Sequence, residues 1–192
     1  MYLGTVSKVT FYEQLHRIDC DLAEQTRQTR CPFCQGRLDL APYARKPRGG
    51  PDGIPDELSV RMSLCCGRQG CRRRRLPPSC LFLGRKVYWA AIVLVVVALR
   101  QQRQRSFSAA RLRSLFGVSW ETVLRWMDYF AEVFPASGRW QRVRGQVPSG
   151  VRDEELPAAL LEAFVEARGD ERDGVIGCLE LLARGEAGEH AS

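Results

Sequence analysis

Four of the eight cysteines in this 192-residue chain are spaced as two pairs that could share one metal ion. Cys31 and Cys34 flank Pro-Phe, and Gly36 follows closely enough to permit a tight turn. Two thiolates at this spacing form a zinc knuckle, which grips the metal from one side. A second pair lies beyond residues 35–65 and supplies two more thiolates. We therefore predict one zinc site with four ligands: Cys31, Cys34, Cys66 and Cys71.

The predicted site is structural rather than catalytic. Four thiolates close a tetrahedral coordination shell, whereas a catalytic zinc keeps one position open for water and usually recruits His or carboxylate ligands. Cys66 is preferred to Cys65 because its distance from Cys71 is closer to the usual spacing of two to four residues between ligands. Free thiols in a small core are the alternative interpretation.

The remaining cysteines have no partner at ligand spacing. Cys80 and Cys178 are predicted to be small buried side chains. His16 and Cys20 lie four positions apart on a helix that the apolar pattern predicts from Lys8 to about Arg27. Two ligands do not make a site, so we expect both to be bystanders.

Basic residues gather around and after the cysteines. Residues 1–150 carry 25 basic and 11 acidic side chains, a net charge of +14, whereas residues 151–192 carry 4 and 11, a net charge of −7. Arg72 to Arg75 directly follow the last predicted ligand, and Arg85 and Lys86 come soon after. Metal binding would fix these cations on a rigid turn, where they can track a phosphate backbone. A nucleic-acid partner is therefore favoured over a solubility surface or an anionic membrane.

The sequence predicts no secretion signal, because its first twenty residues soon turn polar and charged. The longest apolar run, residues 87–99, falls short of the roughly 20 residues that a membrane-spanning helix needs. Eight cysteines without a secretion signal indicate a reducing compartment, where paired thiols are more often metal ligands than disulfides. We expect a cytoplasmic protein, associated with the nucleoid if it binds DNA, and no membrane partner.

Residues 106–134 predict two helices joined by a tight turn. Ser108 can cap the first helix, Gly117 can make the turn, and Ser119 can cap the second helix. Apolar side chains at helical spacing are expected to form the shared core: Leu112, Leu115, Val118, Val123 and Trp126. The start of the second helix would then present Trp120, Glu121, Leu124 and Arg125 outward, where a helix-turn-helix meets the major groove of DNA.

This segment resembles the Gly-Val-Ser-x-x-Thr-Val-x-Arg-Trp core of many bacterial helix-turn-helix proteins. The chain matches that core at Gly117, Val118, Ser119, Thr122, Val123, Arg125 and Trp126. It departs from it at Glu121, which places an acid near phosphate, and at Leu124, which places an apolar group where a polar base contact is common. Base reading through cytosine and thymine, a lost DNA function and an ordinary helical hairpin all fit the pattern. The residues predicted to contact DNA are Arg72, Arg73, Arg74, Arg75, Arg85, Lys86, Trp120, Glu121, Thr122 and Arg125.

The order of these modules resembles the N-terminal region of zinc-ribbon transposases of insertion elements, over about residues 31–134. In that family the ribbon and the helix-turn-helix recognise the ends of the element, and an RNase H-like domain with three carboxylates cuts and joins DNA using divalent metal. Only residues 135–192 follow here, too few for that domain. The resemblance therefore implies a transposase-derived DNA-binding protein that acts as a regulator or accessory factor of a mobile element. We expect no enzymatic activity.

The predicted fold class is mainly α, with a small zinc ribbon of short β-strands followed by a helix-turn-helix domain and C-terminal helices. The predicted segments are an N-terminal amphipathic helix (1–29), a four-cysteine zinc ribbon with an arginine-rich stretch (30–83), a helix-turn-helix domain (84–138), a linker (139–155) and acidic C-terminal helices (156–192). The acidic helices could join a homodimer or bind a protein partner.

Two other functions fit the same residues. A zinc-ribbon module could bind an acidic protein through its basic patch, in which case nucleic-acid binding would be weak or insensitive to salt. An RNA-binding protein could stack bases on exposed aromatic side chains such as Tyr43 or Trp120.

Overall fold

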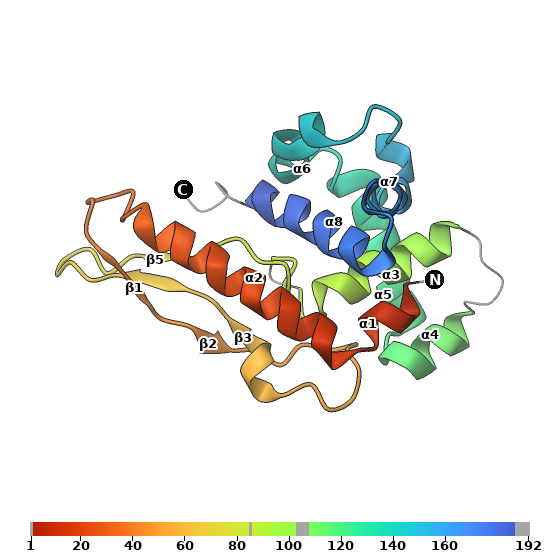
Figure 1. Ribbon diagram of the computed structural model, residues 1–192, viewed down its shortest axis with the longest axis horizontal. Helices are drawn as coiled ribbons and strands as arrows, with labels where there is room; N and C mark the ends of the chain where they lie inside the picture. Colours follow the sequence, from red (N-terminus) through yellow and green to blue (C-terminus); the bar gives the residue numbers. More distant parts are fainter. Residues whose placement is uncertain (1, 85, 103–107, 187–192) are drawn as a thin grey trace.

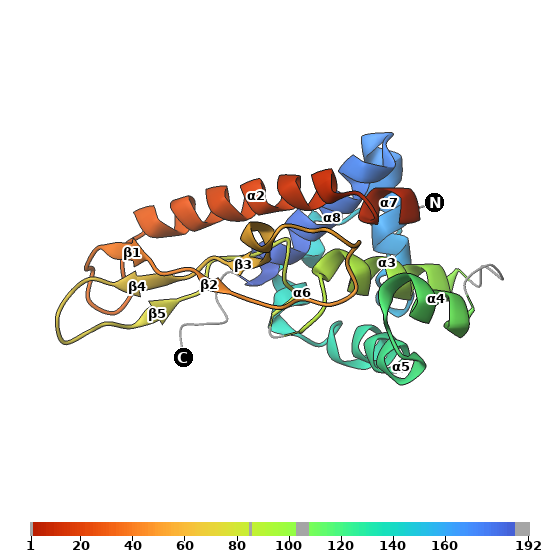
Figure 2. The same cartoon turned by 90° about the horizontal axis from the view of Figure 1, so that it is seen from below.

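A computed structural model describes residues 2–84, 86–102 and 108–186 and shows a mainly α fold with small antiparallel sheets. The chain begins with a single helical turn, α1 (Leu3–Val6), followed by the long helix α2 (Val9–Gln28). Figures 1 and 2 show α2 running along one side of the molecule from α1 to the strands. Phe11, Leu15 and Ala23 are buried on its inner face.

Within the described residues, five short strands follow α2. β1 (Leu38–Leu40), β4 (Leu64–Cys66) and β5 (Arg74–Arg75) form a three-stranded antiparallel sheet in the order β1-β4-β5. β2 (Tyr43–Ala44) and β3 (Val60–Arg61) form a separate pair, and a 3-10 turn (Asp56–Ser59) leads into β3. Leu38 and Leu64, with Cys31 and Cys66, form a small buried cluster separate from the main core. So small a cluster buries little apolar surface, and the sheet needs further support.

Helix α3 (Ala90–Gln101) is the centre of the main core, and its residues from Ala90 to Leu99 are all buried. It begins only at Ala90, because the preceding backbone pairs with Arg48 instead. The Arg48 amide donates to the Val87 carbonyl, and the Trp89 amide donates to the Arg48 carbonyl. Helices α1, α5, α7 and α8 pack around α3. None of the helices in the described part of the chain is long and apolar enough to cross a membrane.

Helices α4 (Ala109–Phe116) and α5 (Trp120–Asp128) form a hairpin that continues into a π-helical turn (Tyr129–Val133). Ser108 and Ser119 cap the two helices by accepting hydrogen bonds from the amides of Arg111 and Thr122. Gly117 adopts the left-handed conformation, φ 59°, that the turn requires. The predicted caps and turn are therefore present, and α5 packs against α3.

One predicted core residue of this hairpin is wrong. Leu115 is 45% exposed, whereas its neighbour Phe116 is only 6% exposed. Both side chains are apolar, so the sequence pattern does not choose between them. Phe116 instead of Leu115 lies on the face of α4 that meets the core.

The segment predicted as a linker, 139–155, instead contains helical structure and contributes Trp140 and Val143 to the core. It contains most of α6 (Gly138–Val143) and two 3-10 turns (Arg144–Gln146 and Asp153–Glu155). Trp140 is fully buried, and its indole nitrogen donates to Asp153 over 2.9 Å. The chain continues with α7 (Ala158–Arg168) and α8 (Glu171–Glu186), which pack against each other, and α8 also packs on α6.

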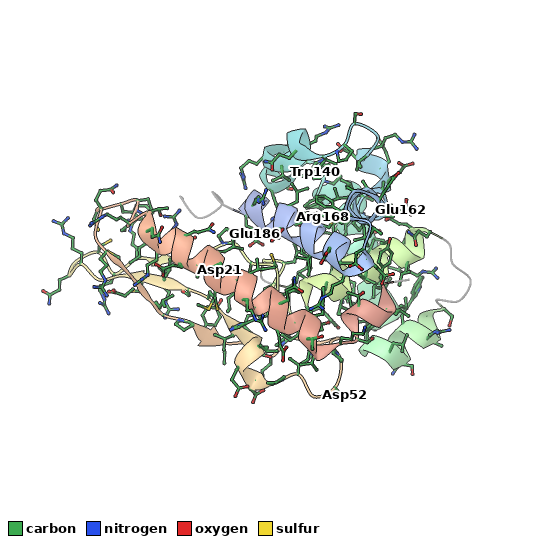
Figure 3. All side chains as sticks on the ribbon, in the orientation of Figure 1. Asp21, Asp52, Trp140, Glu162, Arg168 and Glu186 are labelled. Carbon is green, nitrogen blue, oxygen red and sulfur yellow. The ribbon has the colours of Figure 1, made fainter. Side chains whose placement is uncertain are left out.

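A buried group of charges joins the strands to the C-terminal helices. Glu186, at the end of α8, contacts Arg139 of α6 over 2.6 Å and Arg61 of β3 over 3.9 Å. Its carboxylate also accepts a hydrogen bond from the amide of Gly84. All three charged side chains are at most 8% exposed. Figure 3 labels Glu186 at the end of α8.

Candidate metal centre and its basic surroundings

The first pair of cysteines lies in a tight turn directly after α2. The amide of Cys31 donates to the carbonyl of Gly36 over 2.9 Å, and the amide of Gln35 donates to the carbonyl of Cys31 over 2.8 Å. A Cβ atom on Gly36 would lie 3.0 Å from the Sγ of Cys66 and 3.2 Å from that of Cys34. Gly36 is therefore required for the two halves of the site to approach each other.

The second pair is positioned by the hairpin between β4 and β5. Cys66 is the last residue of β4, and its amide donates to the carbonyl of Arg73 over 3.0 Å. Cys71 lies in the turn, where its amide donates to the carbonyl of Arg68 over 3.2 Å. Strand pairing thus places both sulfurs on the side that faces the Cys31–Cys34 turn.

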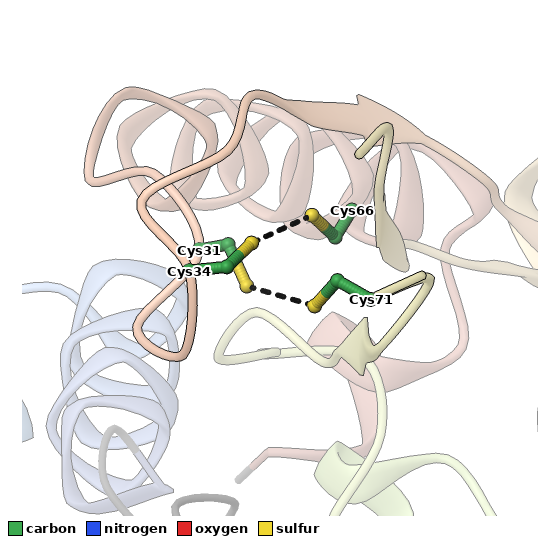
Figure 4. Close-up of side chains that lie close together, drawn as sticks. All are labelled: Cys31, Cys34, Cys66 and Cys71. Carbon is green, nitrogen blue, oxygen red and sulfur yellow. Dashed lines mark hydrogen bonds between the residues drawn. The ribbon is translucent and has the colours of Figure 1, made fainter. Parts of the chain in front are cut away.

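The four predicted ligands meet at one point (Figure 4). The Sγ atoms of Cys34 and Cys66 are 3.4 Å apart and those of Cys31 and Cys71 are 3.8 Å apart. All four sulfurs lie within 4.8 Å of one another. Four sulfurs around one zinc at a Zn–S distance of ~2.3 Å would be separated by about 3.8 Å in a regular tetrahedron. The spacing therefore fits a tetrahedral metal site.

The electrostatics of the cluster also favour a cation. Burial opposes ionisation of Cys31, but hydrogen bonds from the amides of Phe33 and Cys34 lower its pKa to about 7. The amide of Arg68 lowers the pKa of Cys66, but burial and hydrogen bonds with the neighbouring thiols raise it to about 12. Four thiolates this close repel one another, and a divalent cation would allow all four to ionise.

Cys65 lies outside this cluster. Its Sγ donates to the backbone carbonyls of Arg72 and Cys66 over 3.5 and 3.8 Å. Among the described residues, only the four predicted cysteines form a group that could hold a metal. Cys80 and Cys178 are both fully buried, as predicted.

His16 and Cys20 are neighbours on α2, with Nε2 and Sγ 3.6 Å apart. No third ligand joins them within the part of the chain that the structure describes. The pair therefore gives no second metal site there.

The predicted phosphate-binding arginines have different surroundings. Arg72, Arg73 and Arg74 are exposed. Arg73 lies over the ring of Phe33, with its Cζ 4.0 Å from the ring centroid. Arg75 is half-buried and donates to the hydroxyl of Thr29 over 2.7 Å, so it secures the end of α2. Arg72 and Arg74 are therefore the two that are best placed to meet phosphate.

The two other predicted cations after the cysteines differ as well. Lys86 is half-buried, with its Nζ 3.9 Å from the ring centroid of Tyr129, and burial lowers its pKa. Its cation is therefore partly used in an aromatic contact. Arg85 lies outside the described residues.

On α5, Glu121, Leu124 and Arg125 are exposed, as predicted. Arg125 is held by its own helix, because its Nη2 donates to the hydroxyl of Thr122 over 3.0 Å and its Nε to the carbonyl of Glu121. Thr122 itself is only 7% exposed, so its predicted DNA contact is corrected to a role in orienting Arg125.

Trp120 is also less accessible than expected. It is half-buried against the main core, and the Cζ of Arg100 on α3 lies 4.7 Å from its ring centroid. One face of the indole is therefore used within the protein. The outward surface at the start of α5 consists mainly of Glu121, Leu124 and Arg125.

Two residues beside the metal centre were missed by sequence reasoning. Phe33 lies between Cys31 and Cys34 and is 46% exposed, and Arg184 reaches the same region from α8. The position of Phe33 inside the knuckle is a local signal from which its exposure could have been predicted. Nothing local marks Arg184, because only the tertiary fold brings it there.

Fold and site together define a mainly helical protein with a four-cysteine cluster that could bind a metal. No protein-family model, no curated protein and no solved structure matches this chain. Its function must therefore be inferred from its own residues.

Proposed function

We propose that this protein is a zinc-containing DNA-binding protein in which the Cys31–Cys71 segment is a zinc ribbon and α4–α5 is a helix-turn-helix. The observation that carries the proposal is the capped hairpin at Gly117. This turn directs one face of α5 into the core and leaves Arg125 on the outer face. A hydrogen bond to the Thr122 hydroxyl orients the Arg125 side chain there. A helix presented in this way, with α3 behind it, suits the major groove.

The charges of the ribbon support the same proposal. Arg72 and Arg74 are exposed beside the cysteine cluster, and residues 1–150 have a net charge of +14. Figure 2 shows β5 and α5 toward the same side of the molecule, away from α2. A duplex lying along this side would contact the ribbon through its phosphates and would contact α5 through its bases.

Zinc is the metal that best suits four thiolates in a closed tetrahedron. Cys31, Cys34, Cys66 and Cys71 would hold it, and its contribution would be to fold the ribbon. The derivation from an insertion-element transposase, and the role of regulator or accessory factor of a mobile element, stay predictions from the sequence resemblance.

The test is fluorescence anisotropy of labelled duplex DNA with the zinc-loaded protein over a salt series. The first variant replaces both Arg72 and Arg74 by Gln, since neither side chain supports the ribbon. The slope of log affinity against log salt should become shallower by about 0.9 for each phosphate that the variant no longer neutralises. Arg168→Gln is the matched control, because Arg168 is exposed on α7, away from both modules.

Arg125→Gln tests whether Arg125 contributes to the recognition of a DNA sequence. A preferred site is first selected from a random duplex library with the wild-type protein. The variant should then lose about 1–3 kcal/mol of preference for that site over random DNA. Duplex affinity that is absent, or insensitive to salt and to both sets of variants, would contradict the proposal and favour an acidic protein partner.

A further inference from the structure

A groove opens beside the metal centre, between α2, the Cys31–Cys34 turn, β5 and the end of α8. Its volume is about 370 Å³. Known small-molecule sites range over roughly 300–1,000 Å³, so this groove can take one nucleotide-sized group but not a double helix. It is walled by segments far apart in the sequence, including residues at the C-terminal end of α2, the following Thr29, and Arg184 of α8.

The floor of the groove is apolar and carries an aromatic platform. Leu22, Leu38 and Leu76 line it together with Phe33. Phe33 remains 46% exposed although Arg73 lies over its ring. A planar guanidinium stacked on an aromatic ring is a surface on which a further planar group stacks well.

The rim of the groove is positive. Arg74 and Arg184 are both exposed, and neither forms an ion pair with any residue that the structure describes. Among the described residues of the lining the acidic one is Glu186, which is already neutralised by Arg139 and Arg61. The groove therefore offers uncompensated guanidinium groups above an apolar and aromatic floor.

We propose that this groove binds an unpaired nucleotide of a polynucleotide. The base stacks on Phe33 and Arg73, and the flanking phosphates meet Arg74 and Arg184. Positive grooves with aromatic platforms bind single strands in this way. An acidic peptide would use the cations but would leave the planar platform without a partner. The inference rests on the proposed nucleic-acid binding and adds to it a preference for duplexes with a single-stranded end.

The test compares a blunt duplex with the same duplex carrying a short thymine overhang, using the full zinc-loaded chain and anisotropy. The overhang should raise affinity about fivefold or more, given the usual contribution of one stacked base. Arg184→Gln should lower the ratio of overhang to blunt affinity below the wild-type value, because a phosphate contact of the overhang is lost. Arg168→Gln removes the same charge from α7 and should keep the wild-type ratio.

A second pair of variants tests the platform. Phe33→Leu keeps the apolar contact and loses stacking, so the ratio should fall, whereas Phe33→Trp should keep it. Zinc content is measured in both because Phe33 adjoins two ligands. If Phe33→Leu loses zinc, the result with Arg184→Gln decides, since Arg184 lies on α8 outside the ribbon.

The outcomes separate this inference from the proposed function. If the protein binds blunt duplex and the overhang does not raise affinity, the groove inference is overturned and the proposed duplex binding stands. A thymine oligonucleotide bound with no affinity for blunt duplex overturns the duplex proposal and supports the groove. If deoxyribose and ribose overhangs raise affinity equally, the groove binds unpaired nucleotides of either sugar. If a glutamate-rich peptide competes with the overhang more strongly than a free oligonucleotide does, the nucleotide proposal is overturned.

Discussion

Replacing Cys66 by Ser should abolish metal binding and unfold the three-stranded sheet, whereas replacing its neighbour Cys65 should change neither. Cys66 lies in the cluster of four sulfurs, with its Sγ 3.4 Å from that of Cys34. Cys65 is adjacent in sequence, but its Sγ points to the carbonyl of Arg72. The two variants remove the same atom from consecutive positions of β4, so each is the control for the other.

The size of the effect follows from how little else holds the three-stranded sheet. Its small core buries only two aliphatic side chains, Leu38 and Leu64, which contribute ~1.5–3 kcal/mol each. Ordering even ten residues costs about 15 kcal/mol, at ~1.5 kcal/mol per residue. A structural zinc supplies ~10–16 kcal/mol, which is of the size required. Cys66→Ser should therefore unfold the sheet, whereas Cys65→Ser should change stability by about 0.5 kcal/mol or less.

The assay measures bound zinc per chain, limited proteolysis and helical circular dichroism for both variants. Cys66→Ser should bind little zinc and be cleaved within residues 31–75, while much of the helical signal stays because the main core is separate. Cys65→Ser should resemble the wild type. If Cys66→Ser kept full zinc and resisted proteolysis, the four-cysteine site would be refuted.

Three further predictions concern the helical part. Trp140→Ala should cost ~3–5 kcal/mol in urea unfolding because the indole is fully buried, and a neutral effect would restore the linker interpretation. Ser119→Ala should cost ~1 kcal/mol by removing the cap of α5, and Ser119→Asn should cost less. Burial raises the pKa of Asp19 to about 6 from 3.8, so its contribution to stability is full below about 4 and is lost as pH rises through about 6. As the pH rises from about 4 to about 6, the unfolding free energy of Asp19→Asn should therefore increase by about 3 kcal/mol relative to that of the wild type. A difference between the two proteins that does not change with pH would contradict this.

The four-cysteine cluster and the α4–α5 hairpin could be predicted because their signals are local. Two cysteines around Pro-Phe, or Ser119 directly before a helix, fix short-range geometry whatever surrounds them. The choice of Cys66 over Cys65 followed from spacing and agrees with the sulfur cluster, since adjacent residues of a strand point to opposite faces.

The errors concern residues whose environment is set by distant parts of the chain. Trp140 and Val143 lie in a segment rich in Arg and Gly, and their apolar spacing is too short to predict a helix without α8 against it. Phe116 and Leu115 are equally apolar, so only the packing of α4 on the core decides which is buried. Thr122 matched a motif position, but its hydroxyl is used within the protein.

The buried charges fix the position of the strands relative to the C-terminal helices. Arg61 of β3 contacts Glu186 and donates to the carbonyl of Pro77, and its charge also favours the ionised form of buried Asp19 on α2. Two carboxylates thus face Arg61 and Arg139, and each charge would be costly to leave without a partner. Because Glu186 closely follows Arg184 on α8, the same contacts that bury Glu186 fix Arg184 at the groove. The buried ion pairs between the strands and α8 therefore also complete the proposed nucleotide site.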